Sequence, residues 1–179
     1  MSAAAPAPAP LVVVMGVSGS GKTTIGTLVA RELQVEFIDG DSLHPIANVE
    51  KMASGTPLDD DDRAPWLEIV GRTLHEHGER GDGLVVACSA LKGMYRDQIR
   101  SQAPAALFLH LSGSLEVLTR RIEGRSGHFM PAALLQSQID TLEPLAGDED
   151  GYVLDINQPV AEMVREAVVH LRELVTARS

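Results

Sequence analysis

The stretch Gly16-Val17-Ser18-Gly19-Ser20-Gly21-Lys22-Thr23 decides the fold of this chain. It matches the eight-position pattern of a phosphate-binding loop (P-loop). Glycines let backbone N–H groups turn inward around phosphate oxygens without Cβ clashes, and the next helix offers its unpaired N–H groups to the same anion. An apolar strand over 11–15 precedes the loop and a helix is expected from about Lys22 to Leu33. This context is the one that the motif requires, so the sequence predicts nucleotide binding.

The loop residues have distinct expected roles. Lys22 reaches the β- and γ-phosphates and also serves catalysis, while the Thr23 hydroxyl holds Mg²⁺. ATP and Mg²⁺ are therefore the expected cofactors. The loop and the first helical turn supply the predicted nucleotide-binding residues Gly16, Ser18, Gly19, Ser20, Gly21, Lys22, Thr23 and Thr24.

Short β-branched runs alternate with amphipathic stretches along the rest of the chain, which is typical of βαβ units on a parallel sheet. We expect a three-layer α/β/α fold with a five-stranded parallel sheet. The predicted strands cover 11–15, 35–39, 84–88, 106–111 and 152–155. The predicted helices cover 22–33, 42–53, 63–77, 91–101, 115–123, 132–142 and 160–177, with a loop over 54–62.

Composition limits the possible partners. The 179 residues carry a net charge of −10, which argues against a wide nucleic-acid surface. Cys88 is the only cysteine, so an internal disulfide and a cysteine-based zinc site are excluded, and a reducing compartment fits. The longest apolar run, 11–15, is too short to span a bilayer. We therefore predict a cytoplasmic protein without membrane or nucleic-acid partners.

The first ten residues alternate Ala and Pro and lack the basic start of a signal peptide. We expect a disordered extension over 1–10, because this composition cannot form a core. Residues 11–179 are predicted to form a single domain.

Two motifs that would direct the chain to other nucleotide-binding classes are absent from the sequence. A GTPase needs an Asn-Lys-x-Asp segment, and none occurs. A motor-type ATPase usually has an Asp-Glu pair after an apolar strand, whereas the strand over 84–88 is followed by Ser89-Ala90. Both observations favour small kinases.

Asp39-Gly40-Asp41 stands at the carboxyl end of the second predicted strand, where doubly wound sheets bind ligands. Two carboxylates at this place can divide two roles. We expect Asp39 to orient metal-bound water and Asp41 to accept a proton from an attacking hydroxyl.

From this turn onward, the chain resembles the gluconokinase family. The resemblance rests on the following residues: the segment 39–45 (Asp-Gly-Asp-Ser-Leu-His-Pro), Asn48, Lys51-Met52, Gly55, Pro57-Leu58, Asp60, Asp62-Arg63, Pro65-Trp66-Leu67, Cys88-Ser89-Ala90-Leu91-Lys92, Tyr95-Arg96-Asp97, Arg125, Gly127-His128-Phe129-Met130-Pro131 and Asp155-Ile156. It covers nearly the whole chain from Leu11. It implies a P-loop kinase fold with a mobile lid over about 124–131, transfer of the ATP γ-phosphate to the terminal hydroxyl of D-gluconate, and a homodimer.

The acceptor side needs a cation for the gluconate carboxylate. Arg63 is the candidate, since a guanidinium matches a carboxylate bidentately. Lys92 and Arg96 are further sources of positive charge near the cleft. The full set of predicted substrate-binding residues is Asp41, His44, Lys51, Arg63, Ser89, Lys92 and His128.

Two arginines flank the base of the lid. Arg125 is expected to reach the transferring phosphoryl group and Arg121 to contact the nucleotide, while the loop carrying Asn157 and Pro159 wraps around adenine. Catalysis is thus assigned to Asp41, Lys22 and Arg125. Two alternatives stay open: a kinase for another small, shikimate-like hydroxy acid, and a nucleotide-binding regulatory module without transfer activity.

Overall fold

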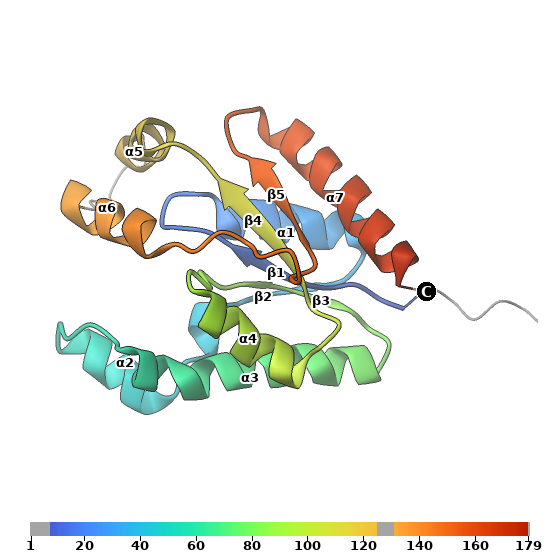
Figure 1. Ribbon diagram of the computed structural model, residues 1–179, viewed down its shortest axis with the longest axis horizontal. Helices are drawn as coiled ribbons and strands as arrows, with labels where there is room; N and C mark the ends of the chain where they lie inside the picture. The colour runs from blue at the N-terminus through green and yellow to red at the C-terminus, as the bar shows by residue number, and fades with distance from the viewer. Residues whose placement is uncertain (1–7, 125–130, 179) are drawn as a thin grey trace, which may run out of the picture.

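Five parallel strands form one sheet in the order β2-β3-β1-β4-β5 (Figure 1). The computed structural model describes residues 8–124 and 131–178. The strands are β1 (Leu11–Met15), β2 (Glu36–Asp39), β3 (Leu84–Ala87), β4 (Leu107–Ser112) and β5 (Gly151–Asp155). The helices are α1 (Lys22–Leu33), α2 (Ile46–Ala53), α3 (Asp60–Glu79), α4 (Gly93–Gln102), α5 (Leu115–Glu123), α6 (Ala132–Thr141) and α7 (Val160–Ala177), with one 3₁₀ turn, η1 (Gly40–Leu43).

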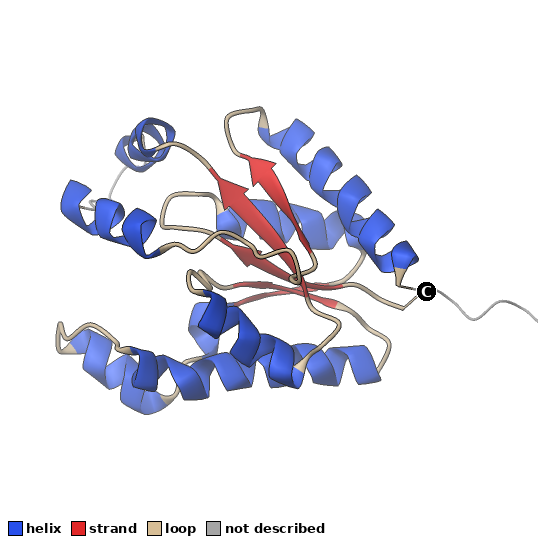
Figure 2. Ribbon diagram, viewed as in Figure 1, coloured by secondary structure: helices blue, strands red, loops and turns tan. Residues whose placement is uncertain are grey.

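The sheet lies between two layers of helices, as predicted. Helices α1 and α7 cover one face, while α3 and α4 cover the other (Figure 2). Alternate residues of β1 serve the two faces: Val12 and Val14 belong to the core beneath α1 and α7, whereas Val13 and Met15 belong to the core beneath α3 and α4. All five β1 residues are buried, which explains the continuous apolar run in the sequence.

Strand register brings three functional segments to one edge of the sheet. Val14 of β1 and Asp39 of β2 both pair with Ala87 of β3. The phosphate-binding loop, the Asp39-Gly40-Asp41 turn and Ser89 therefore leave the sheet side by side at its carboxyl edge, where α/β proteins of this kind bind ligands.

Two predicted boundaries near this edge were wrong. Helix α3 begins at Asp60 rather than at Arg63, because Asp59 and Asp62 form a capping box: the Asp62 amide donates to Asp59 Oδ1 at 2.8 Å and the Asp59 amide donates to Asp62 Oδ2 at 2.9 Å. The predicted helix over 42–53 is divided into η1 and α2, since Pro45 restricts the preceding residue to an extended conformation.

Two predicted segments lie wholly or partly outside the described residues. Residues 1–7 of the predicted disordered extension and residues 125–130 of the predicted lid are not described. Pro10, at the end of the extension, accepts a hydrogen bond from the Leu84 amide at 3.0 Å. Within the described ranges, no helix is both long enough and apolar enough to cross a membrane.

Candidate active site

A cavity of about 590 Å³ opens at the carboxyl edge of the sheet. It joins the phosphate-binding loop to the acidic turn after β2 and to the end of β3. Its lining residues are Ser18, Gly19, Gly21, Lys22, Thr23, Asp39, Asp41, Arg63, Ala87, Cys88, Ser89, Leu91, Ile122 and Gln138.

The phosphate-binding loop is fixed by its own backbone. The Gly16 amide donates to the Ser89 carbonyl at 3.2 Å, with Gly16 at φ +149°, a conformation that requires glycine here because a Cβ would lie 2.7 Å from Ser20 Oγ. Gly21 precedes α1 at φ +96°, and no side chain caps the helix. Lys22 and Thr23, at the amino end of α1, line the cavity, so the positive end of the helix dipole favours an anion there.

The side chains of the loop and of the first turn of α1 differ in exposure. Ser20 is fully buried, and its Oγ finds no partner among the described residues. Thr23 and Thr24 are exposed in the first turn of α1. Lys22 Nζ donates to the Val17 carbonyl at 3.1 Å, which folds the ammonium group back over the loop that it serves.

Replacing Lys22 tests the loop. Lys22→Ala is expected to raise the KM for ATP by about ten- to a hundred-fold, because a charge-assisted hydrogen bond to phosphate is lost, and to reduce turnover severely. Steady-state kinetics with varied ATP measures both. The melting temperature should stay near that of the wild type, since Lys22 lines the cavity rather than the core. Normal ATP kinetics in the folded variant would contradict the assigned role.

The acidic turn is held by two hydrogen bonds and lies close against β3. The Asp41 amide donates to Asp39 Oδ1 at 3.0 Å, and Trp66 Nε1 donates to the Gly40 carbonyl at 2.8 Å. A Cβ on Gly40 would lie 2.4 Å from the Ala87 carbonyl, so only glycine lets the turn approach β3 this closely. Asp39 and Asp41 consequently both line the cavity.

Thr23 and Asp39 bring two oxygen donors to the same cavity. Hydroxyl and carboxylate oxygens suit Mg²⁺, which usually keeps several waters and binds substrate phosphates rather than a complete protein cage. Over the described part of the chain, no group of three or more His, Cys, Asp or Glu side chains could hold a metal by itself. The donor set therefore fits a nucleotide-bound magnesium ion.

His44 packs against the base of the acidic turn. Its ring stacks on Trp66 with centroids 4.1 Å apart, and its Nδ1 lies 3.3 Å from Asn48 Nδ2. Burial lowers the pKa of His44, with Asp41 opposing and Arg63 adding to the shift. His44 is thus neutral near pH 7, and it is not among the described residues that line the cavity.

Of the predicted acceptor-side cations, Arg63 is the one that lines the cavity. Its Nη1 donates to the Tyr95 hydroxyl at 3.3 Å, and its guanidinium lies 5.7 Å from the Tyr95 ring centroid. These neutral contacts orient the group while leaving its charge to act on a ligand.

The two predicted lysines are instead paired with acidic residues of α3. Lys51 Nζ lies 2.5 Å from Asp62 Oδ2, and Lys92 Nζ lies 3.0 Å from Asp60 Oδ1. Hydrogen bonds to these carboxylates raise the pKa of both lysines. Neither lysine is among the described residues that line the cavity. Asp60 also accepts from the Tyr95 hydroxyl, and the hydrogen bonds from Tyr95 and Lys92 lower the pKa of its carboxyl group.

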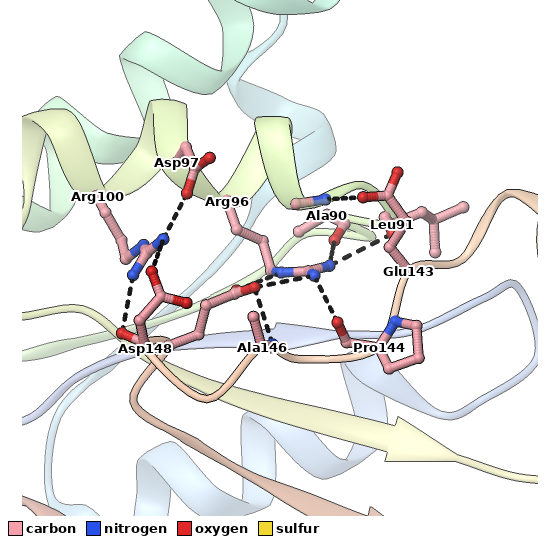
Figure 3. A network of polar contacts seen from close by, with 11 residues as sticks. Ala90, Leu91, Arg96, Asp97, Arg100, Glu143, Pro144, Ala146 and Asp148 are labelled. Carbon is pink, nitrogen blue, oxygen red and sulfur yellow. Dashed lines mark hydrogen bonds and ion pairs between the residues drawn. The ribbon is translucent and has the colours of Figure 1, made fainter.

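Arg96 lies in the interior rather than at the acceptor site, contrary to the suggestion from sequence. It is 1% exposed and pairs with Glu149 through Nε at 2.5 Å and Nη2 at 3.2 Å. Figure 3 shows Arg96 directed toward the Ala90, Leu91 and Pro144 carbonyls. Its Nη1 also donates to the Ala90 carbonyl at 2.9 Å, and Ala90 has a left-handed backbone at φ +44°. Arg96 therefore supports the loop that carries Ser89 and Leu91 into the cavity.

Two further polar or reactive side chains are buried. His77 has hydrogen-bonding contacts with the Thr73 carbonyl at 2.9 Å and with Glu36 Oε2 at 3.0 Å. Burial of Cys88 raises the pKa of its thiol to about 12. The thiol is protonated near neutral pH and is not a nucleophile.

A second cavity of about 370 Å³ lies beside the first. Arg121 and Asn157 line it with Val117, Arg120, Ile156 and Gln158, and Arg121 Nη2 donates to the Ile156 carbonyl. Arg121 Nη1 would also lie 3.7 Å from a Cβ at Gly21, so this side chain borders the phosphate-binding loop. Pro159 is the N-cap residue of α7 and is not among the lining residues.

Sequence analysis did not identify Gln138 as a residue of the site. Gln138 of α6 lines the main cavity, and its Oε1 accepts a hydrogen bond from the Ser18 amide at 2.8 Å. A pair separated by 120 residues leaves no local sequence signal.

Arg125 and His128 belong to the residues that are not described, so their roles stay predictions.

The fold and the cavity define a P-loop kinase for a small molecule, because the phosphate-binding loop shares the cavity with the acidic turn and with Arg63. The family model described as shikimate kinase matches residues 18–167, which places the chain in that broad family of small kinases.

Individual relatives define the family more narrowly. The chain is 46% identical over 165 residues to the thermosensitive gluconokinase of Escherichia coli (strain K12), covering 90% of this chain and 88% of the relative. It is 46% identical over 157 residues to the gluconokinase of Gluconobacter oxydans (strain 621H), covering 88% of each chain. The crystal structure of a gluconokinase from Sinorhizobium meliloti 1021 superposes with a TM-score of 0.85 at 46% identity, covering 94% of this chain and 95% of the other. The chain belongs to the gluconokinase family.

Proposed function

We propose that this enzyme transfers the γ-phosphate of ATP to the 6-hydroxyl of D-gluconate, giving 6-phospho-D-gluconate and ADP. The observation that carries the proposal is the single cavity shared by the phosphate-binding loop, Asp41 and Arg63. A kinase for a hydroxy acid needs these three parts together: a triphosphate cradle, a proton acceptor and a cation for the carboxylate. The similarity to gluconokinases over most of the chain supports gluconate as the acid.

The chain's residues divide the work of the reaction. Lys22 and the loop amides hold and neutralise the phosphates. Asp41 accepts the proton of the attacking hydroxyl, which becomes bonded to the γ-phosphorus as the bond to the ADP oxygen breaks. Arg63 holds the carboxylate at the other end of the acceptor. Arg121 and Asn157 hold the base side of the nucleotide in the neighbouring cavity.

Magnesium is proposed as the second cofactor. Thr23 and Asp39 would hold it, directly or through water, and the ion would neutralise charge on the β- and γ-phosphates. We also propose that, when a lid closes, Arg125 reaches the transferring phosphoryl group and His128 covers the acceptor. The enzyme is further proposed to be a homodimer that acts in the cytoplasm.

The identity of the acceptor is tested by comparing three candidate substrates. ADP release is measured with ATP, Mg²⁺ and either D-gluconate, shikimate or the neutral hexitol sorbitol. We expect the highest kcat/KM with gluconate, because only gluconate combines a carboxylate with a distant primary hydroxyl on a flexible chain. A preference for shikimate would transfer the assignment to the alternative hydroxy-acid kinase, and no acceptor-dependent ADP release would favour a regulatory module.

Arg63→Lys tests how the carboxylate is recognised. Lysine keeps the positive charge but loses the planar fork and its contact with Tyr95. We expect the KM for gluconate to rise by about ten- to a hundred-fold, with the KM for ATP nearly unchanged. The matched control is Arg72→Lys, an exposed residue on the same helix paired with Glu68. A rise in the KM for ATP with no change for gluconate would assign Arg63 to the nucleotide instead.

A further inference from the structure

Gln138 connects helix α6 to the phosphate-binding loop in the main cavity. Its Oε1 accepts the Ser18 amide at 2.8 Å, and Gln138 and Ser18 both line the cavity that contains Asp41 and Arg63. Because a backbone N–H needs an acceptor, this bond determines which end of the carboxamide faces the loop. The oxygen faces Ser18, so the NH₂ group is the end left for another partner.

The NH₂ group of Gln138 makes no hydrogen bond to the residues that the structure describes. By contrast, Gln136, two residues earlier on α6, is exposed and donates to Asp140 Oδ1 at 2.8 Å. Gln138 is only partly exposed, and one of its two ends is already held. A partly buried amide donor in a polar cavity is a ready contact for a ligand oxygen.

Two hydrogen bonds of Glu143 hold the carboxyl end of helix α6, close to Gln138 in the sequence. Just after the helix, the Glu143 amide donates to the Leu91 carbonyl at 2.7 Å, and Glu143 Oε1 accepts the Gly93 amide at 3.1 Å. Leu91 itself lines the cavity. The loop between β3 and α4 therefore fixes the end of α6, and with it the position of Gln138, against the same site.

The hydrogen bond between Ser18 and Gln138 indicates which part of the substrates the Gln138 NH₂ group would contact. The Ser18 N–H is already engaged by a carboxamide oxygen, whose partial negative charge would oppose a phosphate oxygen beside it. A neutral hydroxyl of the acceptor would fit beside this carboxamide better than a phosphate oxygen would. A polyhydroxy acid offers several hydroxyl oxygens to an amide donor there.

We propose that Gln138 is an acceptor-binding residue, which donates a hydrogen bond from its NH₂ group to a hydroxyl of the bound sugar acid while its oxygen is held by Ser18. This proposal rests on the proposed function and adds a specificity-determining contact to it. Gln138 would help to align the acceptor with the phosphate-binding loop.

Two substitutions separate this role from simple support of the loop. Gln138→Glu keeps an oxygen for the Ser18 amide but removes the donor, whereas Gln138→Met removes both at similar length. If Gln138 contacts the acceptor, both variants should raise the KM for gluconate by about tenfold. The KM for ATP of Gln138→Met should stay within about twofold of the wild type. Gln136→Met is the matched control and should leave both constants unchanged.

The readouts are KM values for gluconate and ATP, with melting temperatures to verify folding. Normal gluconate KM in Gln138→Glu, with a defect in Gln138→Met alone, would overturn the proposal in favour of loop support. A Gln138→Met defect that appears mainly in the KM for ATP would also overturn it. If the wild-type enzyme prefers another acceptor from the panel, the proposed substrate fails separately, and the same variants then decide the role of Gln138 with that acceptor.

Discussion

We expect Asp41→Asn to lower kcat for gluconate phosphorylation by roughly 10²–10⁴-fold, because this is the contribution of a positioned base. Asn is nearly isosteric but cannot take the proton of the attacking hydroxyl. The turn should keep its shape, because the contacts that hold it use the Asp41 backbone amide, the Asp39 carboxylate and Trp66 rather than the Asp41 side chain. The KM for ATP should therefore change little. Single-turnover kinetics at saturating substrates measures the chemical step directly.

Asp39→Asn is the companion variant. Asp39 caps η1 and stands beside Thr23 in the cavity, so its loss should act on the magnesium ion and be partly rescued by raising the Mg²⁺ concentration. Asp41→Asn should show no such rescue. If Mg²⁺ restores Asp41→Asn and not Asp39→Asn, the two roles must be exchanged.

We expect Arg96→Met to lower the free energy of unfolding by about 3–5 kcal/mol, because this is the usual cost of removing one partner of a buried ion pair. Glu149 would stay buried without its cationic partner, and the Ala90, Leu91 and Pro144 carbonyls would each lose the hydrogen bond from Arg96 (Figure 3). Urea denaturation measures the loss.

Arg100→Met is the matched control on the same helix. Arg100 pairs with Asp97 at the surface, and an exposed pair contributes about 0–1 kcal/mol. The double variant Arg96→Met with Glu149→Leu should recover much of the stability, because no charge is then left buried without a partner. Equal losses for Arg96→Met and Arg100→Met would contradict this account of the network.

Much of the fold could be predicted because it depends on local pattern. The buried strands are apolar runs, and α7 begins and ends where its helical periodicity does, at Val160 and Ala177. The phosphate-binding loop and the acidic turn could also be placed, since both follow predicted strands directly. The parallel sheet then brings them to one edge without further information.

The sequence could not resolve features that depend on tertiary partners. Lys51 and Lys92 could not be distinguished from Arg63 by sequence, because their pairing with Asp62 and Asp60 depends on how α3 packs. Arg96 likewise found its partner, Glu149, 53 residues away. The start of α3 was predicted three residues too late for a different reason. A run of four aspartates is typical of a loop, but here Asp59 and Asp62 form the capping box that begins the helix.

Identification of the product tests the central claim most directly. The enzyme is incubated with ATP, Mg²⁺ and D-gluconate, and the products are examined by phosphorus NMR and mass spectrometry. We predict ADP together with one new phosphate monoester, whose proton coupling places it on the C6 methylene of gluconate. ATP consumed only to inorganic phosphate, or a phosphate attached to a secondary hydroxyl, would contradict the account.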